Sequence, residues 1–232
     1  MNNYLEQQKE ATLATLIAIE GIDGSGKGTQ AKRLQERLVA EGKRAALLSF
    51  PRYRDTLFGE AIGQFLNGEF GTLNEVNPFL AALLYAGDRS ESKQFLLSLL
   101  AENDVVVLDR YVASNIAHQG AKATGDAQQK LIKRIQTIEF EINHLPQANM
   151  NILLDLPALE ARKLIAKKNK RDYTDKEADL QEEDTDYLES VRNVYLQLAT
   201  DTSNWQIVSL LDKEGLRSIE SIGDEIYHMV TE

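Results

Sequence analysis

The sequence contains no cysteine among its 232 residues. Disulfide bonds, thiolate metal sites and cysteine nucleophiles are therefore excluded, and a cytoplasmic protein is the expectation. Long hydrophobic runs are also lacking, since none approaches the roughly 20 residues that a membrane-spanning helix needs. We accordingly expect no membrane partner.

Positive charge is scarce as well. Lys and Arg total 26 against 36 Asp and Glu, which gives a net charge of −10. A surface of that sign repels a nucleic-acid backbone, so we expect no nucleic-acid partner. Small anionic ligands remain possible, because a local group of cations can outweigh the charge of the whole protein.

The chain length suits one α/β domain, and hydrophobic residues, at 43%, suffice for a sizeable core. Residues 1–12 are polar and lack the apolar segment of a secretion signal. We interpret 1–12 as an extension and 13–232 as a single domain. One compositional break, at 162–186, runs from basic to acidic with little apolar content, and we interpret about 162–178 as a lid.

Five short apolar runs predict buried strands at residues 16–20, 45–50, 105–109, 151–156 and 206–210. Their nearly continuous apolar character is typical of a parallel sheet covered on both faces. Apolar residues at helical spacing predict helices between and after the runs, over 29–39, 78–100, 126–142, 187–198 and 219–229. Asn77 and Asp126 are the expected N-caps of two of them. Strands alternating with helices indicate an α/β fold with a doubly wound sheet.

A glycine-rich segment lies between the first predicted strand and the first helix. In such a turn, backbone N–H groups close around a phosphate, the helix dipole adds attraction, and Lys27 reaches the β- and γ-phosphates. The glycine spacing does not match the G-x-G-x-x-G of dinucleotide-binding proteins. The alternative is a flexible turn with an exposed lysine. The predicted ATP-binding residues are Gly21, Ile22, Asp23, Gly24, Ser25, Gly26, Lys27, Gly28 and Thr29.

One position departs from the usual pattern of this segment. The hydroxyl residue that directly follows the lysine, and coordinates magnesium, is replaced by Gly28, while Thr29 comes one place later. The Gly-Lys-Gly-Thr form resembles that of adenylate kinases, in which the threonine serves magnesium through water. By that resemblance Thr29 is the metal candidate.

Four segments together resemble the thymidylate kinase family, from Thr15 to the C-terminus. They are Glu20 to Lys27 with Thr29-Gln30; Phe50-Pro51-Arg52-Tyr53; Asp88-Arg89 preceded by Tyr85; and Asp109-Arg110-Tyr111-Val112-Ala113-Ser114-Asn115 with His118-Gln119-Gly120. The resemblance implies a P-loop kinase fold, with a five-stranded parallel sheet of order 2-3-1-4-5 and a short lid. It also implies a homodimer that transfers the γ-phosphoryl group of MgATP to dTMP, giving dTDP and ADP.

Roles for single residues follow from the same resemblance. The catalytic candidates are Lys27, Arg110, Asp23 and Arg52, of which the two arginines grip the acceptor phosphate. The substrate-binding candidates are Asp23, Phe50, Arg52, Tyr85, Arg89, Arg110, Asn115, His118 and Gln119. Tyr85 stacks on the thymine and Arg89 donates to it, while His118 stands where the family often has tyrosine. The magnesium candidates are Asp109, Thr29 and Glu20.

The residues support this chemistry independently. Lys27, Arg52 and Arg110 each follow a predicted strand end, and ligands of open α/β sheets bind at those ends. Converging cations are what phosphoryl transfer between two anions needs, because its barrier is largely electrostatic. Taken singly, Tyr85 could be a core residue, Arg89 a surface ion-pair partner and His118 a satisfied buried histidine.

The lid candidates are Lys167, Lys168, Lys170 and Arg171, which belong to the densest basic cluster of the chain. Since position 24 is glycine, the resemblance favours charge supplied from the lid over an arginine in the P-loop. A solvated helix face is the alternative. Residues 169–172 have the sequence Asn-Lys-Arg-Asp, which matches the guanine-binding motif of GTPases. In GTPases this motif follows a strand, whereas here it follows a predicted helix, so we interpret the match as a coincidence.

Two other functions are alternatives to the thymidylate kinase interpretation. One is a kinase of the same fold for another nucleoside monophosphate. The other is a non-catalytic nucleotide-binding protein, which only Gly28 favours.

Overall fold

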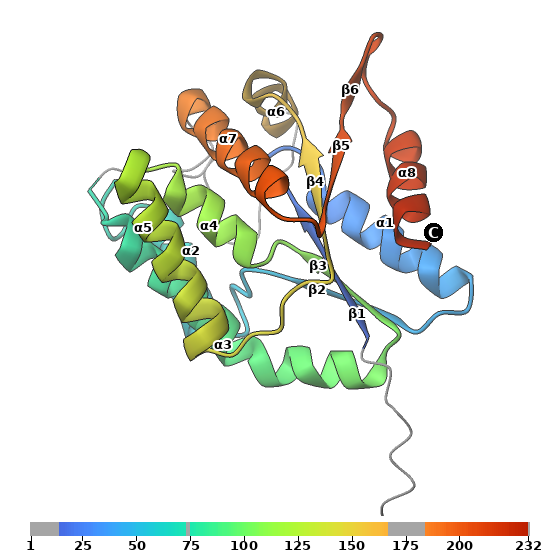
Figure 1. Ribbon diagram of the computed structural model, residues 1–232, viewed down its shortest axis with the longest axis horizontal. Coiled ribbons are helices and arrows are strands. Elements are labelled where there is room, and N and C mark those ends of the chain that lie inside the picture. Colours follow the sequence, from blue (N-terminus) through green and yellow to red (C-terminus); the bar gives the residue numbers. More distant parts are fainter. Residues whose placement is uncertain (1–13, 73–74, 167–183, 232) are drawn as a thin grey trace, which may run out of the picture.

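The computed structural model describes residues 14–72, 75–166 and 184–231. A five-stranded sheet forms its centre (Figure 1). The strands are β1 (Thr15–Glu20), β2 (Ala45–Ser49), β3 (Val105–Asp109), β4 (Met150–Asp155) and β5 (Trp205–Ser209). All neighbouring strands pair in parallel, in the order β2-β3-β1-β4-β5, so the predicted sheet and its order are confirmed. A short antiparallel hairpin of β6 (Leu211–Asp212) and β7 (Gly215–Leu216) follows and was not predicted.

The helices are α1 (Lys27–Ala40), α2 (Leu57–Leu66), α3 (Pro78–Glu102), α4 (Val112–Gly120), α5 (Gly125–Gln136), α6 (Ala158–Ile165), α7 (Thr185–Asp201) and α8 (Ile219–Thr231). A π-helix, η1 (Thr137–Ile142), continues α5. Asn77 caps α3 as predicted, since its Oδ1 accepts from the N–H of Phe79 at 2.9 Å. The predicted cap at Asp126 is wrong: Thr124 is the N-cap, and Asp126 lies in the first turn of α5, where its charge suits the helix dipole.

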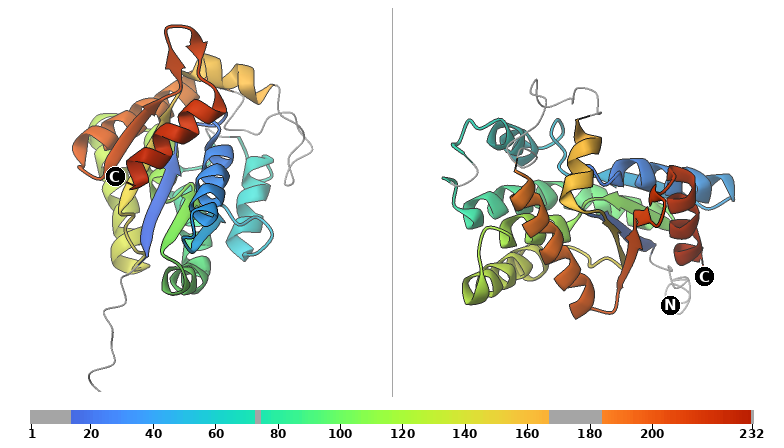
Figure 2. Two further views of the ribbon diagram at one scale, coloured as in Figure 1. Left: turned by 90° about the vertical axis from the view of Figure 1, so that its right-hand side faces the viewer. Right: turned by 90° about the horizontal axis from the view of Figure 1, so that it is seen from above.

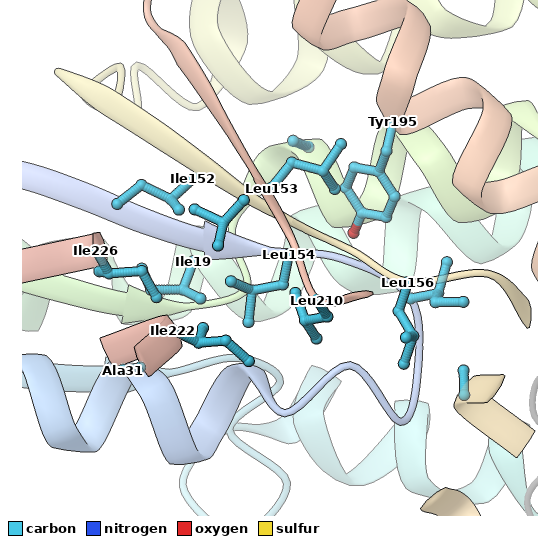
Figure 3. Close-up of a cluster of buried hydrophobic side chains, with 14 of the residues drawn as sticks. Ile19, Ala31, Ile152, Leu153, Leu154, Leu156, Tyr195, Leu210, Ile222 and Ile226 are labelled. Atoms are coloured by element: carbon cyan, nitrogen blue, oxygen red, sulfur yellow. The ribbon is translucent and has the colours of Figure 1, made fainter. Parts of the chain in front are cut away.

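Helices cover both faces of the sheet, as its apolar strands require (Figures 1 and 2). On β1, Ile17 and Ile19 belong to the cluster that contains the buried residues of α1 and α8. Leu16 and Ala18 alternate with them and pack in the cluster of α3, α4 and α5. Figure 3 shows part of the first cluster, with Ile19 close to residues of α1 and α8. The sheet is thus the middle layer of three.

Several connections start at the carboxyl ends of the strands and meet at one edge of the sheet. Residues 21–26 follow β1, residues 50–53 follow β2, and Arg110 follows β3. Ligands of open α/β sheets bind at this edge. Within the described ranges, no helix has the length and apolar character to cross a membrane.

Candidate active site

The glycine-rich segment forms a tight turn between β1 and α1. Gly24 and Gly26 have positive φ angles of 85° and 82°, which favour glycine, and Gly26 is the N-cap of α1. A Cβ at Gly24 would lie 2.5 Å from the carbonyl oxygen of Ala161 in α6. Both the backbone angle and the neighbouring helix therefore exclude a larger residue at position 24.

Lys27 lies at the start of α1 and is 6% exposed. Its Nζ donates to the carbonyl oxygen of Ile22 at 2.8 Å, so the side chain folds back over the turn. Burial, assisted by the nearby charge of Arg110, lowers the pKa of Lys27 to about 8. A phosphate bound in the turn would counter both effects, which is the environment expected of a phosphate-binding lysine.

Arg110 follows β3 and forms an ion pair with Asp23 of the glycine-rich turn. The two side chains are 19% and 15% exposed, so the pair lies at the mouth of the site. Arg110 has a φ of 67°, in the left-handed region that non-glycine residues rarely adopt. Such a conformation persists where the surroundings fix it, and it is frequent at functional sites.

A cavity beside this pair collects eight of the nine predicted substrate-binding residues. They are Asp23, Phe50, Tyr85, Arg89, Arg110, Asn115, His118 and Gln119. The remaining lining residues, Pro51, Tyr53, Leu66 and Ser114, were not predicted. Segments from β1 to α4 in the sequence are thus brought to one place, as the order of the motifs implied.

The inner end of the cavity is organised by Glu139, a residue that no sequence motif identifies. Glu139 lies on η1, is fully buried and forms an ion pair with Arg89, whose Nε donates to its Oε2 at 3.0 Å. The Nδ2 of Asn115 donates to the other oxygen of Glu139 at 2.9 Å and to the carbonyl of Ala82 at 3.0 Å. Arg89 therefore does pair with a carboxylate, but inside the protein and not on its surface.

Unpartnered polar atoms remain at the same end. Oδ1 of Asn115 and both amide atoms of Gln119 are buried without a hydrogen-bond partner. Buried groups of this kind normally have partners, so each needs an explanation. A ligand with complementary donors and acceptors, seated in the cavity, supplies one.

His118 lies on α4 and is buried against α7. The hydroxyl of Tyr187 donates to the His118 carbonyl at 2.9 Å and lies 3.3 Å from Nδ1, while Nε2 lies 3.5 Å from a guanidinium nitrogen of Arg110. Burial lowers the pKa of His118 to about 3, so the ring is neutral near pH 7. It is both a satisfied histidine and part of the cavity lining.

Arg52 is the one predicted substrate-binding residue that does not line this cavity. Its Nε lies 3.3 Å from Asp55, a guanidinium nitrogen donates to Ser92 at 3.3 Å, and the group stacks on Phe95 at 4.8 Å. The neighbouring Tyr53 faces the cavity instead. The chain bends and turns over residues 50–53, and the sequence did not indicate which of the two side chains faces inward.

The predicted metal residues fall into two groups. Glu20 is fully buried, and its oxygens accept hydrogen bonds from the Tyr111 N–H and from two hydroxyl groups, so it is not available to a cation. Asp109 instead keeps a buried Oδ1 without a hydrogen-bond partner. Thr29, at the start of α1, is exposed. Among the described residues, no group of three or more acidic or histidine side chains could hold a metal. Asp109 and Thr29 fit magnesium, which is usually bound by one or two protein groups and the substrate phosphates.

The unusual Gly28 also has a structural explanation. A Cβ at this position would lie 2.9 Å from Oδ2 of Asp109, so the carboxylate occupies the space that a serine or threonine would need. The predicted lid residues Lys167, Lys168, Lys170 and Arg171 lie outside the described residues, as does the extension 1–12. Of the predicted lid, residues 162–165 belong to α6.

A glycine-rich turn that contains Lys27, and a cavity joined to it through Asp23 and Arg110, have the arrangement of a P-loop kinase for a small phosphorylated acceptor. The comparison with family models identifies the particular family. Residues 19–218 match the model described as thymidylate kinase, and the chain belongs to that family.

Individual relatives agree with this assignment. The chain is 35% identical over 184 residues to a thymidylate kinase of Mycobacterium tuberculosis, an alignment that covers 79% of this chain and 85% of the relative. It is 35% identical over 216 residues to a probable thymidylate kinase of Pyrococcus horikoshii, covering 92% and 94%. A solved thymidylate kinase structure from Candida albicans superposes with a TM-score of 0.71 at 24% identity, covering 94% and 91%, and thus shares the fold.

Proposed function

We propose that this enzyme transfers the γ-phosphoryl group of ATP to dTMP, producing dTDP and ADP for the synthesis of dTTP. The observation that supports it best is the cavity, which is lined by Arg110 at one end and by Arg89 and the amide side chains of Asn115 and Gln119 at the other. A nucleoside monophosphate has the same polarity, with a phosphate at one end and a base at the other.

At the phosphate end, Arg110 binds the acceptor phosphate and Lys27 binds the transferred group. The acceptor is already an anion, so no general base is needed, and catalysis consists of positioning and charge stabilisation. Groups placed in this way lower such barriers by several kcal/mol (roughly 3–4 for one donor). Asp23 orients Arg110 through their ion pair and lies at the junction of the two substrates.

At the base end, we assign the unpartnered atoms to thymine. Nδ2 of Asn115 already donates to Glu139 and Ala82, so Oδ1 is the group available to accept from the base N3–H. Gln119 supplies a further donor, and Arg89, oriented by Glu139, donates to a base carbonyl. Cytosine, which has no N3–H, leaves the Asn115 oxygen unpaired, and such mismatches are strongly rejected by buried polar sites.

Three further features belong to the proposal. Asp109 and Thr29 would hold Mg²⁺ together with the phosphates, and the ion would supply charge neutralisation on the donor. Tyr53 contributes to the phosphate end, in a place where the sequence favoured Arg52. The four lid residues, Lys167, Lys168, Lys170 and Arg171, remain predicted to cover the phosphates and exclude water.

We also propose that the enzyme is a homodimer, and the cytoplasmic location stays a prediction. Apolar side chains are exposed side by side on α2 and α3, among them Phe58 at 37%, Leu80 at 59% and Leu83 at 37%. Exposed apolar groups gathered in one place are typical of an interaction surface.

The test is a coupled ADP-release assay with MgATP and dTMP, dUMP, dCMP, dGMP or AMP as acceptor. We expect efficient turnover with dTMP and at least about a hundredfold lower kcat/KM with dCMP, because a buried acceptor is left unpaired. Lys27→Ala is the matched control and should bind dTMP normally without turnover. Turnover of another monophosphate in preference to dTMP would contradict the assignment of the unpartnered atoms to thymine. ATP binding without turnover of any acceptor would indicate a non-catalytic binding protein.

A further inference from the structure

The backbone of Arg110 is held on both sides by the end of β1. The N–H of Arg110 donates to the carbonyl of Ile19 at 3.1 Å, and the next N–H, of Tyr111, donates to Oε1 of Glu20 at 2.8 Å. Between these two bonds Arg110 adopts its left-handed conformation. Strained conformations persist when surrounding groups determine them, and Glu20 is one of those groups.

The second oxygen of Glu20 connects the same arginine to α7. Oε2 accepts from the hydroxyl of Ser114 at 2.7 Å and from that of Tyr195 at 3.0 Å, and the two hydroxyls lie 2.8 Å apart. Ser114 Oγ in turn lies 3.4 Å from a guanidinium nitrogen of Arg110. Four side chains from β1, α4, α7 and the end of β3 thus form one buried network.

Glu20 and Tyr195 are both fully buried, and neither lines the cavity. Figure 3 shows the Tyr195 ring extending from α7 toward the sheet, among apolar residues of the core. Buried polar groups in an apolar setting are costly unless their hydrogen bonds are satisfied. The end of a strand does not require a buried carboxylate that accepts at least three hydrogen bonds. Glu20 lies directly behind a substrate-binding arginine, and this position suggests a role for it.

We propose that Glu20 and Tyr195 are positioning residues that fix Arg110, through the Tyr111 N–H and the Ser114 hydroxyl, in the orientation that binds the acceptor phosphate. The inference rests on the proposed function, in which Arg110 contacts that phosphate. It assigns to Glu20 a role in acceptor binding in place of the metal binding that its position in the sequence suggested. It also makes α7, whose described residues do not line the cavity, part of the phosphate site.

Tyr195→Phe removes the hydroxyl while leaving a ring that still packs against Trp205, with 6.4 Å between the ring centroids. We expect the dissociation constant for dTMP, measured by isothermal titration calorimetry, to rise about tenfold. The constant for thymidine, which lacks the phosphate, should not change. Loss of a purely structural contact would weaken the binding of both ligands to the same extent, and that result would overturn the proposal.

Two further variants separate positioning from folding. Glu20→Gln keeps the size of the side chain but replaces one acceptor oxygen by a donor, so it should show the same selective loss of dTMP binding. Tyr227→Phe is the matched control: it removes a hydroxyl that contacts Glu41 between α8 and α1, and binding of both ligands should match that of the wild type. Equal loss of dTMP binding in Tyr227→Phe would contradict a specific effect.

A double-mutant cycle with Arg110→Ala completes the test. If Tyr195 acts through Arg110, Tyr195→Phe should not change the ratio of thymidine to dTMP affinity any further in the Arg110→Ala background. An unchanged ratio in Arg110→Ala alone would refute the proposed role of Arg110. A ratio that changes in Arg110→Ala but not in Tyr195→Phe would refute only the positioning role of Tyr195 and leave the role of Arg110 intact.

Discussion

At the scale of single residues, Lys27 combines two properties that usually exclude each other. It is buried in the glycine-rich turn, and the proposed function requires it to carry a positive charge when ATP binds. Burial, with help from Arg110, brings its pKa to about 8, close to the pH at which the enzyme is expected to work. The free enzyme therefore loses this charge within an accessible pH range.

The pH dependence of ATP use follows from this pKa. As the pH rises through about 8, the free enzyme loses the Lys27 proton, so kcat/KM for ATP should fall about tenfold per further pH unit. In the ATP complex the phosphates raise the pKa again, so kcat should stay level over that range. Steady-state rates between about pH 6.5 and 9.5, at saturating dTMP, measure both quantities.

The acidic side of the same profile is a control. The pKa of His118 is lowered to about 3 by burial, so its protonation should not affect the rate near pH 6. A parallel fall of kcat and kcat/KM above pH 8 would contradict the role given to Lys27. A decrease of the rate near pH 6 that is absent in His118→Gln would contradict the interpretation of His118 as buried and neutral.

The sequence indicates where residues that belong to a motif lie, but it does not identify residues whose contacts depend on a distant partner. Lys27, Arg110 and Asn115 are fixed by their distance from a strand end. Glu139 was missed because its partner Arg89 is 50 residues away, and an acidic residue in a helix looks like a surface residue. Glu20 was recognised, but its three hydrogen-bond donors could not be seen.

At the scale of secondary structure, η1 explains a specific failure of the periodicity argument. The spacing of Leu131, Ile135, Ile138 and Ile142 predicts one continuous helix with a buried apolar face. Leu131 and Ile135 are buried, but Ile142 is 64% exposed. A π-turn advances the chain by an extra residue per turn, so later residues rotate away from the face that the earlier ones define.

The same turn places the carboxylate of Glu139 inside the protein, and this gives a prediction for stability. Glu139→Ala leaves Arg89 buried without its counter-charge, which should lower the free energy of unfolding by about 3 kcal/mol. It should also weaken dTMP binding, because Arg89 and Asn115 lose a common partner. Urea unfolding and calorimetry measure the two effects.

Glu141→Ala is the control on the same π-helix, because Glu141 is exposed and accepts a hydrogen bond from the nearby hydroxyl of Thr137. Its unfolding free energy should stay within about 0.5 kcal/mol of the wild type. Equal stability of the Glu139→Ala and Glu141→Ala proteins would show that the buried ion pair is not important for the fold.

The strands and most helices could be predicted, and two short helices could not. The five predicted strands agree with the structure to within one residue at each end, because their apolar runs are bounded by polar residues. The short helices α2 and α4 were missed: α2 contains two glycines, and α4 is buried along its whole length, so no amphipathic pattern identifies it.

At the scale of the whole molecule, the exposed apolar face of α2 and α3 predicts self-association. Leu80 and Leu83 are neighbours on one side of α3, and one turn further on Gly87 contacts the ring of Phe58 from α2. We expect a mass near twice the 26.0 kDa of one chain in sedimentation equilibrium. Leu80→Glu combined with Leu83→Glu should give the monomer, because a charge on each leucine opposes burial of the face.

Leu159→Glu offers a matched control, since Leu159 is 63% exposed on α6, away from this face. This variant should remain dimeric. A wild-type protein that sediments as a monomer at every concentration would refute the dimer, whereas dissociation by Leu159→Glu would place the interface elsewhere.

The sequence contains a single tryptophan, Trp205, at the start of β5. It stands edge-on to Tyr195, whose hydroxyl joins the network behind Arg110. The intrinsic fluorescence of the enzyme therefore comes from one defined position, between the edge strand of the sheet and α7. Its emission wavelength and lifetime should report any rearrangement of α7 during turnover, so the protein can be followed in stopped-flow experiments without an added dye.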